Sequence, residues 1–378
     1  MKAPNLAILK NTALVFASLL FAFFLLEIIV RVFFPQGDRL FVADSYIKTI
    51  HPKNVTTMRE GAEFKINIKT NGQGFVGASD FTPQKPPNTT RIATLGDSFT
   101  DAYVIDYTKT YSALLEKDLN ASSTDKKYQV YNFGLAGTGT AHQLLTYEHY
   151  IRMYPPDVLV LQFYTGNDFA DNLLFQPGTS TPSAASSVRF GKLREFFSNN
   201  FEAPRFILRK LETLQNIKQV LANFSLVSRD LHYYDANTGY PFYYDAYNVG
   251  TTTAFTAEFP QTCALVKKMY SDTQADHVQM VVVVVPAKEE LFPKDWQAVL
   301  DQNPSMKKQK WDLQKTQHEI SDCLSQNGIP EINMATTFAS VLAHGGEDMY
   351  YKEDPHTNNL GQQMIANALE EYLKKNTK

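Results

Sequence analysis

The longest apolar run of the chain lies near its N-terminus, over residues 12–34. About 20 apolar residues, rising about 1.5 Å each in a helix, are enough to cross about 30 Å of hydrocarbon. Two charged residues interrupt the run, Glu27 and Arg31, and their four-residue spacing lets them pair on one face of a helix. Pro35 then provides a stop. We therefore predict a membrane-spanning helix within residues 1–36.

A cleaved signal peptide is the alternative for this segment. The apolar run is longer than the core of an ordinary signal peptide, and no clear A-x-A cleavage site follows it. We therefore favour an uncleaved, single-pass anchor. The basic residues do not fix its orientation, because Lys2 and Lys10 on one side face Arg31 and Arg39 on the other.

Beyond the anchor, the chain shows two further patterns of apolar positions, one before residue 91 and one after it. Residues 63–69 alternate polar and apolar, as a half-buried strand does, and we expect a small β-rich extension over residues 37–90. From residue 91 onward, short apolar runs without alternation are separated by segments with helical spacing. Such runs are typical of parallel strands that are covered on both faces. The expected strands are residues 92–95, 128–131, 158–163 and 278–285, and the expected helices are 109–119, 141–153, 305–326 and 360–375.

These elements predict an α/β fold, a three-layer sandwich with a mainly parallel sheet, over residues 91–378. Residues 175–260 interrupt its rhythm. They begin with small and polar residues, continue with a helix-like segment over 203–224, and end with many tyrosines. We interpret them as an insertion and a candidate lid. The tyrosines of residues 233–247 suit either stacking on sugar rings or packing in a core.

Composition narrows the possible functions. The formal net charge is −3 and no long basic run is present, so a nucleic-acid partner has no electrostatic support. The two cysteines, Cys263 and Cys323, lack the spacing of a zinc site. They suit either one disulfide or two buried thiols. No metal or organic cofactor is expected.

The first candidate for chemistry is Ser98, in the sequence Gly96-Asp97-Ser98 directly after an expected strand. A serine on a tight turn between strand and helix projects its hydroxyl at the carboxyl edge of the sheet, where open α/β folds place their active sites. By itself, the segment also suits a serine that caps a helix.

Two further segments follow strands and should reach the same edge. Gly137 ends the block that follows the second strand, and Asn167 follows the third. The backbone N–H groups of Ser98 and Gly137 and the side-chain amide of Asn167 can together form an oxyanion hole, which acyl transfer requires. Taken singly, the glycine suits an ordinary turn and the asparagine suits a helix cap.

The fourth segment precedes the C-terminal helix and contains His356. An imidazole can take the proton of a serine hydroxyl, and a carboxylate must hold that imidazole in the correct tautomer. Glu353 and Asp354 stand three and two residues before His356. Both are candidates for the acid.

These four blocks, in this order, resemble the SGNH (GDSL-like) hydrolase family. The resemblance implies Ser98 and His356 as catalytic residues, and Ser98, Gly137 and Asn167 as the oxyanion hole. The family's usual acid sits at the position of Glu353, whereas some membrane-associated, acetyl-transferring relatives look similar in using the spacing of Asp354, which we favour. The anchor, followed by the Asn-x-x-Gly-Phe segment at residues 71–75, resembles bacterial exported members.

The sequence thus predicts a serine esterase or O-acyltransferase that acts on ester groups, O-acetyl groups first among them, of a cell-surface carbohydrate. The resemblance implies that the domain is periplasmic and that its partners are a glycan and, through the anchor, the membrane. Two alternatives remain open: a lipase or thioesterase near the membrane, and a non-catalytic, membrane-tethered binding or assembly protein.

Overall fold

A computed structural model describes residues 6–34, 40–175, 196–197, 200–213, 234–235, 240–250, 253–346 and 348–376. The chain divides into two compact units, which we describe separately. The first consists of Met1–Asp38 and Gly178–Leu231. The second consists of Arg39–Pro177 and His232–Lys378 and contains the sheet.

The first unit contains helix α1 (Leu6–Phe33) and helix α6 (Glu202–Thr213). Within the described residues, one helical stretch, Lys10–Phe33, is long and apolar enough to cross a membrane, with a mean hydropathy of 2.7. Most of its large apolar side chains are exposed. The predicted ion pair is present, with 2.8 Å between Arg31 Nη2 and Glu27 Oε1. Residues 214–224 of the helix expected over 203–224 lie outside the described residues.

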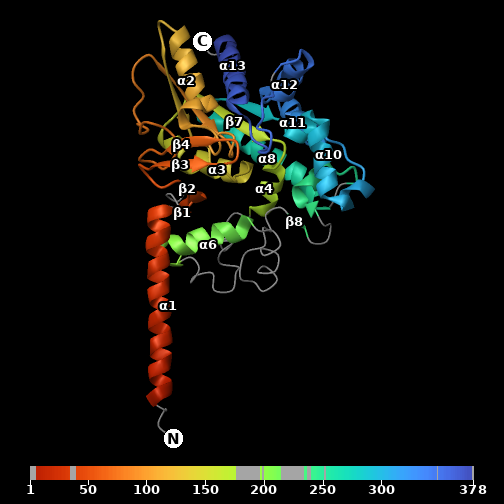
Figure 1. The fold of residues 1–378 in the computed structure, drawn as a ribbon. Helices are drawn as coiled ribbons and strands as arrows, with labels where there is room; N and C mark the ends of the chain where they lie inside the picture. The colour runs from red at the N-terminus through yellow and green to blue at the C-terminus, as the bar shows by residue number, and fades with distance from the viewer. Residues whose placement is uncertain are drawn as a thin grey trace. The chain divides into compact units, whose positions relative to one another are not determined.

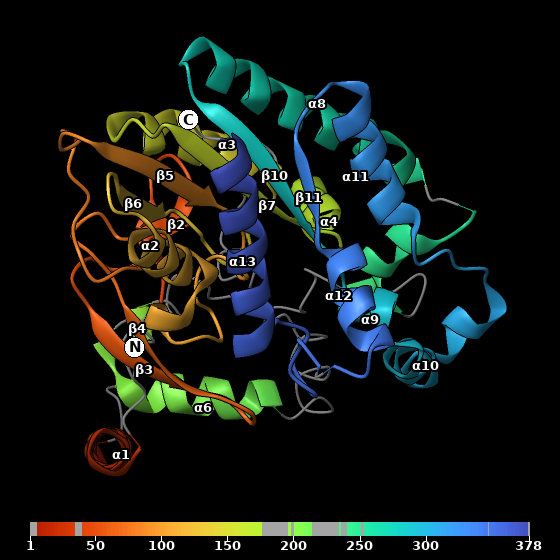
Figure 2. The same ribbon diagram turned by 90° about the horizontal axis from the view of Figure 1, so that it is seen from above.

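The second unit is built on a five-stranded parallel sheet with the order β11-β10-β7-β5-β6, and Figure 2 labels these strands. Its strands are β5 (Thr89–Leu95), β6 (Lys127–Asn132), β7 (Val158–Tyr164), β10 (Gln279–Val285) and β11 (Glu331–Asn333). Every residue of β7 is buried, as the unbroken apolar run predicts. The four long strands all fall where the sequence places them.

Helices cover both faces of this sheet (Figure 2). Alternate valines of β10 point to opposite faces: Val282 and Val284 join one apolar cluster, and Val281 and Val283 join the other. Helices α3 (Thr140–His149), α4 (Asp168–Leu174), α8 (Thr253–Ala275) and α11 (Lys315–Gln326) pack on the first face. Helices α2 (Tyr111–Ser122), α12 (Met334–Ala343) and α13 (Asn359–Asn376) pack on the second. The predicted three-layer α/β fold is confirmed.

The segment before the sheet forms two small antiparallel hairpins, β1 (Val42–Asp44) with β2 (Lys48–Ile50), and β3 (Thr56–Glu60) with β4 (Lys65–Lys69). In β4, Ile66 and Ile68 are buried while Lys65 and Asn67 are exposed, as the alternation of the sequence predicts. A third hairpin pairs β8 (Tyr234–Asp235) with β9 (Tyr240–Pro241). Short 3₁₀ helices lie at η1 (Tyr107–Lys109), η2 (Ile151–Met153) and, directly after β9, η3 (Phe242–Tyr247).

The helix predicted over residues 305–326 is wrong in its first half. A 3₁₀ helix, η4 (Pro304–Lys308), is followed by non-helical chain, and α11 begins only at Lys315. Trp311 and Leu313 leave helical geometry to pack against the buried cluster around Tyr240 and Met306. Helices α9 (Lys288–Leu291) and α10 (Pro293–Gln302), together with β11 and α12, were not expected from the sequence.

A disulfide joins Cys263 of α8 to Cys323 of α11, with 5.8 Å between their Cα atoms. The pair therefore links two helices that pack on the same face of the sheet. Of the two readings that the sequence left open, the structure has the disulfide.

Candidate active site

Ser98 lies in a tight turn directly after strand β5. The backbone N–H groups of Thr100 and Asp101 both donate to the carbonyl oxygen of Asp97, at 3.1 and 3.0 Å. Glycine is required at position 96, because a Cβ atom there would lie 2.3 Å from Thr100 Oγ1. The turn is thus packed closely enough to fix the backbone of the half-buried Ser98.

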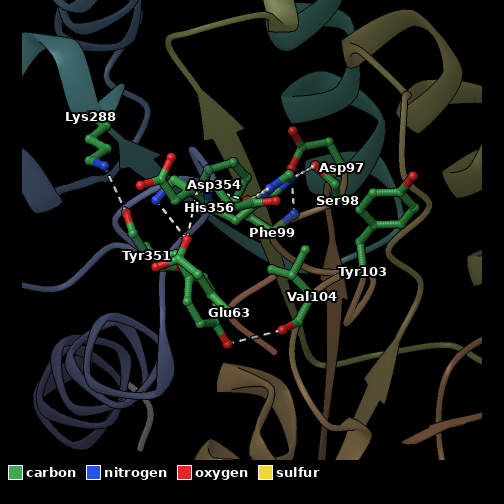
Figure 3. A network of polar contacts seen from close by, with 12 residues as sticks. Glu63, Asp97, Ser98, Phe99, Tyr103, Val104, Lys288, Tyr351, Asp354 and His356 are labelled. Atoms are coloured by element: carbon green, nitrogen blue, oxygen red, sulfur yellow. Dashed lines mark hydrogen bonds and ion pairs between the residues drawn. The ribbon is translucent and has the colours of Figure 1, made fainter. Parts of the chain in front are cut away.

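The structure brings Ser98, His356 and Asp354 together in one chain of hydrogen bonds (Figure 3). His356 Nε2 lies 2.7 Å from Ser98 Oγ, and His356 Nδ1 lies 2.6 Å from Asp354 Oδ1. Asp354 Oδ1 also accepts the backbone N–H of His356 at 3.0 Å. The imidazole is therefore paired with Asp354, two residues before it, rather than with Glu353.

The pKa of Asp354 agrees with an ionised partner for the imidazole. Burial by itself raises the pKa of this carboxyl, but the hydrogen bonds and charge of His356, with a contribution from Arg59, bring it below its ordinary value. Asp354 is therefore a carboxylate at neutral pH. It can orient the ring and stabilise an imidazolium.

The loop that carries Asp354 is held from two sides by side chains of opposite charge. The carboxylate of Glu63, in the loop between β3 and β4, accepts the backbone N–H groups of Lys352, Glu353 and Asp354 at 2.7, 2.6 and 3.0 Å. The ammonium of Lys288, at the start of α9, donates to the carbonyl oxygens of Tyr351 and Lys352 at 2.8 and 2.5 Å (Figure 3).

Sequence analysis missed both of these loop-holding residues. Each is more than 60 residues from the loop along the chain, and neither belongs to a local motif. The three N–H groups hold the pKa of Glu63 below its ordinary value in spite of partial burial, and the charge of Lys288 acts in the same direction. Glu63 is therefore a carboxylate at neutral pH.

The three candidate oxyanion donors border one cavity. Ser98, Gly137 and Asn167 all line it. Gly137 has a φ of +74°, a left-handed backbone that favours glycine, whereas a Cβ atom at this position would meet no other atom within 4 Å. The glycine is therefore needed for the direction of its backbone and not for space.

The amide of Asn167 is oriented by the first turn of α4. Its Nδ2 donates to Asp171 Oδ2 at 3.0 Å, which leaves one N–H of the amide for another acceptor. Its Oδ1 is buried and has no hydrogen-bond partner within the described part of the chain. The amide thus has unused hydrogen-bonding capacity at the cavity.

Two buried carboxyl groups adjoin the motif residues: Asp97 precedes Ser98, and Asp168 follows Asn167. Asp97 accepts the N–H of Phe99 at 3.0 Å, and Asp168 accepts the N–H of Tyr164 at 2.9 Å. Burial raises the pKa of Asp97 to about 6. Burial and the neighbouring charge of Asp97 raise the pKa of Asp168 strongly. Both side chains therefore brace the backbone next to the motif residues.

The cavity has a volume of about 420 Å³ and an aromatic wall. The aromatic side chains that line it are Phe41, Phe99, Tyr103, Tyr164, Tyr243, Tyr244 and Tyr247. Tyr244 and Tyr247 also pack in the buried cluster around Met306, so the tyrosine-rich stretch serves the core and the cavity at once.

One carboxyl group of the cavity wall, Glu289, was not expected from the sequence. It follows β10, and the hydroxyl of Tyr244 donates to its Oε1 at 3.3 Å. Burial raises its pKa. Along the sheet edge, the order is Gly137 after β6, Ser98 after β5, Asn167 after β7 and Glu289 after β10.

The described residues include no group of three or more His, Cys, Asp or Glu side chains that could hold a metal ion. The site thus consists of a serine, an imidazole and a carboxylate beside hydrogen-bond donors.

A protein-family model matches the C-terminal part of the chain. Residues 242–378 match the family model described as SGNH hydrolase-like domain, acetyltransferase AlgX. No curated protein sequence matches the chain significantly.

Similar solved structures include the acetyl xylan esterase AlAXEase, with 14% identity and a TM-score of 0.42, over 75% of this chain and 99% of that one. A lipase/acylhydrolase from Enterococcus faecalis has 11% identity and a TM-score of 0.42, over 76% and 97%. A two-domain esterase active on acetylated mannans has 13% identity and a TM-score of 0.40, over 76% and 49%.

The family match includes His356 and Asp354, and the fold places Ser98 opposite them. Over residues 242–378, the match confirms the expected resemblance to SGNH hydrolase-like domains; the blocks with Ser98, Gly137 and Asn167 lie before the matched residues.

Proposed function

We propose that this protein is a serine esterase or O-acyltransferase that works through an acyl-Ser98 intermediate. The observation that carries the proposal is the hydrogen-bond chain from Ser98 Oγ through His356 to Asp354, at 2.7 and 2.6 Å. A serine hydroxyl is a weak nucleophile until a base takes its proton, and this arrangement supplies the base and its orienting carboxylate.

In the first half-reaction, Ser98 Oγ attacks the carbonyl carbon of the ester while His356 Nε2 accepts the hydroxyl proton. The carbonyl oxygen becomes an oxyanion, for which the N–H groups of Ser98 and Gly137 and the free N–H of Asn167 are the proposed donors. The tetrahedral intermediate then expels the alcohol. The alcohol oxygen receives the proton from the imidazolium, and the acyl group remains on Ser98.

In the second half-reaction, water or the hydroxyl of an acceptor attacks the acyl-Ser98 carbonyl, and His356 takes its proton. The bond between acyl group and serine breaks, and the proton returns to Ser98 Oγ. Hydrolysis and transfer differ only in the attacking hydroxyl. Both outcomes use the same residues.

We propose O-acetyl groups of a cell-surface carbohydrate as the substrate class. The aromatic wall of the cavity suits the apolar faces of sugar rings, and Glu289 offers an acceptor for sugar hydroxyls. The matching family model is described as an acetyltransferase, which supports a short acyl group. The disulfide and the N-terminal apolar helix support a domain held outside the cytoplasm by an uncleaved anchor.

Turnover of p-nitrophenyl acetate by the full chain in detergent tests the proposal. Ser98→Ala should lower the rate at least about 10³-fold, because the nucleophile is lost. Ser325→Ala, which removes an exposed hydroxyl elsewhere, is the matched control and should leave the rate unchanged. Equal turnover by wild type and Ser98→Ala would favour a non-catalytic binding protein.

The acyl specificity separates an acetyl esterase from a lipase or thioesterase. We expect the acetyl ester to be turned over faster than the octanoyl ester of the same alcohol. Faster turnover of the longer ester would favour the lipase alternative. Addition of an oligosaccharide acceptor, with detection of its acetylated form, then distinguishes transfer from hydrolysis.

A further inference from the structure

A carboxylate in the apolar helix α1 has an unusual set of partners. Glu27 is only 6% exposed, although it belongs to the stretch that is apolar enough to cross a membrane. A charge in such a stretch is costly unless it is paired or hydrogen-bonded. Arg31 provides one partner at 2.8 Å, on the same helix.

The remaining partners of Glu27 come from the start of helix α6. Its Oε1 accepts the backbone N–H of Glu202 at 3.0 Å, and its Oε2 accepts the N–H of Ala203 at 2.8 Å. The first N–H groups of a helix have no partner inside the helix, and they carry a partial positive charge. Glu27 therefore caps α6 from a distance of 175 residues along the chain.

Aromatic rings hold the same two segments together on either side of this cap. Phe23 contacts Phe197 and Phe201, with ring centroids 6.1 and 5.1 Å apart. Phe34 contacts Phe206 at 5.4 Å. The start of α6 is thus fixed to α1 over about three helical turns, from Phe23 to Phe34.

The direction of α6 relative to α1 is consistent in two views. α1 runs lengthwise in Figure 1 and is seen end-on in Figure 2, and in both views α6 runs across it. A helix that lies across a membrane-spanning helix runs parallel to the membrane surface.

The depth of the junction follows from helix geometry. Glu27 lies 17 residues after Lys10, where the apolar stretch begins, and this corresponds to roughly 25 Å along the axis. A hydrocarbon core is about 30 Å thick, so Glu27 falls close to its far boundary.

Apolar side chains near this junction are exposed. The side chain of Ile207 on α6 is 43% exposed, and that of Phe196, which precedes α6 in the chain, is 55% exposed.

We propose that α6 is an interfacial helix, which lies in the surface of the same bilayer that α1 crosses and presents apolar side chains such as Ile207 to the lipid. The partner is the lipid of that leaflet. The inference rests on the proposed anchor, and it is independent of the chemistry of Ser98. Glu27 links the two helices, because its carboxylate satisfies the end of α6 at the depth where α6 meets the membrane.

Lipid quenching of single-site fluorophores tests this placement. Three full-length variants, each labelled at one new cysteine, are reconstituted into vesicles that contain nitroxide lipids. Leu19→Cys reports the apolar stretch, Ile207→Cys reports α6, and Lys308→Cys, exposed in the sheet-containing unit, is the control. We expect strong quenching at Leu19 by deep nitroxides, strong quenching at Ile207 by nitroxides near the headgroups, and none at Lys308.

The outcomes separate the anchor from the interfacial helix. Quenching at Leu19 without quenching at Ile207 overturns the interfacial helix and keeps the anchor. Loss of quenching at both sites overturns the two together. A label at Ile207 that is shielded from water but not quenched by lipid assigns that face to protein and also overturns the proposal.

A variant of the linking residue tests the role of Glu27. Glu27→Leu makes α1 more apolar, so insertion of α1 is retained, while the cap of α6 is removed. We expect quenching at Leu19 to persist and quenching at Ile207 to fall toward the level of Lys308. Unchanged quenching at Ile207 would contradict the role of Glu27 as the link.

Discussion

The two halves of the candidate active site are held in different ways. Ser98 sits on a turn made by neighbouring residues: Gly96 permits the close packing, and the carbonyl of Asp97 accepts two N–H groups within the same turn. Asp354 and His356 sit on a partly exposed loop. That loop is fixed by Glu63 and Lys288, which come from distant parts of the chain.

Ser98 is thus positioned by its own turn and by uncharged neighbours. The loop of His356 also has local hydrogen bonds, such as the one from the N–H of Tyr351 to the carbonyl oxygen of His356 at 3.1 Å, but it depends in addition on two charged side chains from distant segments. Changes of charge outside the motif should therefore affect His356 more than Ser98. The predictions below test this contrast, from the largest expected effect to the smallest.

The acid of the base-bearing loop should give the largest effect. Asp354→Asn keeps the size of the side chain but removes the charge that orients His356, and we expect kcat to fall about 10³–10⁴-fold. Glu353→Gln is the matched control one residue away and should leave kcat within about twofold. Steady-state kinetics with p-nitrophenyl acetate provides the measurement. A greater loss in Glu353→Gln than in Asp354→Asn would reverse the assignment.

Glu63 should be a positioning residue for the same loop. Glu63→Gln loses the charged acceptor of three backbone N–H groups, and we expect kcat to fall about 10–10²-fold with little change in KM. Glu60→Gln makes the same change of charge at the end of β3, where Glu60 forms an exposed ion pair with Lys65. It should have kinetics close to wild type.

The kinetic signature of Glu63→Gln distinguishes positioning from folding. A positioning role also predicts an altered pH profile of kcat, because the orientation of His356 depends on the loop. A loss of folded protein with unchanged kcat per folded molecule would show that Glu63 serves stability alone.

Glu289, in the cavity wall at the sheet edge, should affect the affinity for a sugar substrate. Glu289→Gln weakens a hydrogen bond to a sugar hydroxyl, and we expect KM for an acetylated oligosaccharide to rise about tenfold, which corresponds to about 1.4 kcal/mol. Turnover of p-nitrophenyl acetate should stay close to wild type. Glu319→Gln on α11, outside the cavity lining, is the control. Equal losses on both substrates would contradict a role in sugar binding.

A separate prediction concerns stability, rather than turnover, at the same edge. Burial raises the pKa of Glu290 to about 7, while hydrogen bonds from Thr165, Gln317 and Tyr247 oppose this shift. Since the folded protein holds this proton more tightly than the unfolded chain, deprotonation lowers the free energy of unfolding as the pH rises from about 4.5 to about 7. The contribution is at most about 3 kcal/mol.

Glu290→Gln should remove this contribution. Denaturation at about pH 5 and about pH 7.5 should show a smaller loss of stability on raising the pH than in wild type. A pH dependence identical to wild type would contradict the buried, protonated Glu290.

The sequence predicted the elements that local patterns determine. The buried strands follow from apolar runs, and the positions of Ser98, Gly137 and Asn167 follow from the ends of those strands. Among the described residues, the same patterns missed the break before Lys315, because Trp311 leaves the helix to reach a cluster of residues distant in sequence. They missed Glu63, Lys288 and Glu289 for the same reason. A charged residue in a loop carries no local sign of the partner that it will meet.

The contact between Glu27 and α6 could not be predicted from the sequence either. The spacing of Glu27 and Arg31 predicted their pairing, which the structure has at 2.8 Å. The partners of Glu27 on α6 are the backbone N–H groups of Glu202 and Ala203. Because every residue except proline has such a group, the sequence does not indicate which one Glu27 will meet.

Labelling with a fluorophosphonate tests the central claim most directly, because this reagent reacts with a serine only when a neighbouring base activates it. Peptide mass spectrometry of the labelled full chain should find the adduct on Ser98. The adduct should be absent in Ser98→Ala and strongly reduced in His356→Ala. Absence of labelling in the wild type, or equal labelling of wild type and His356→Ala, would contradict an activated serine at this site.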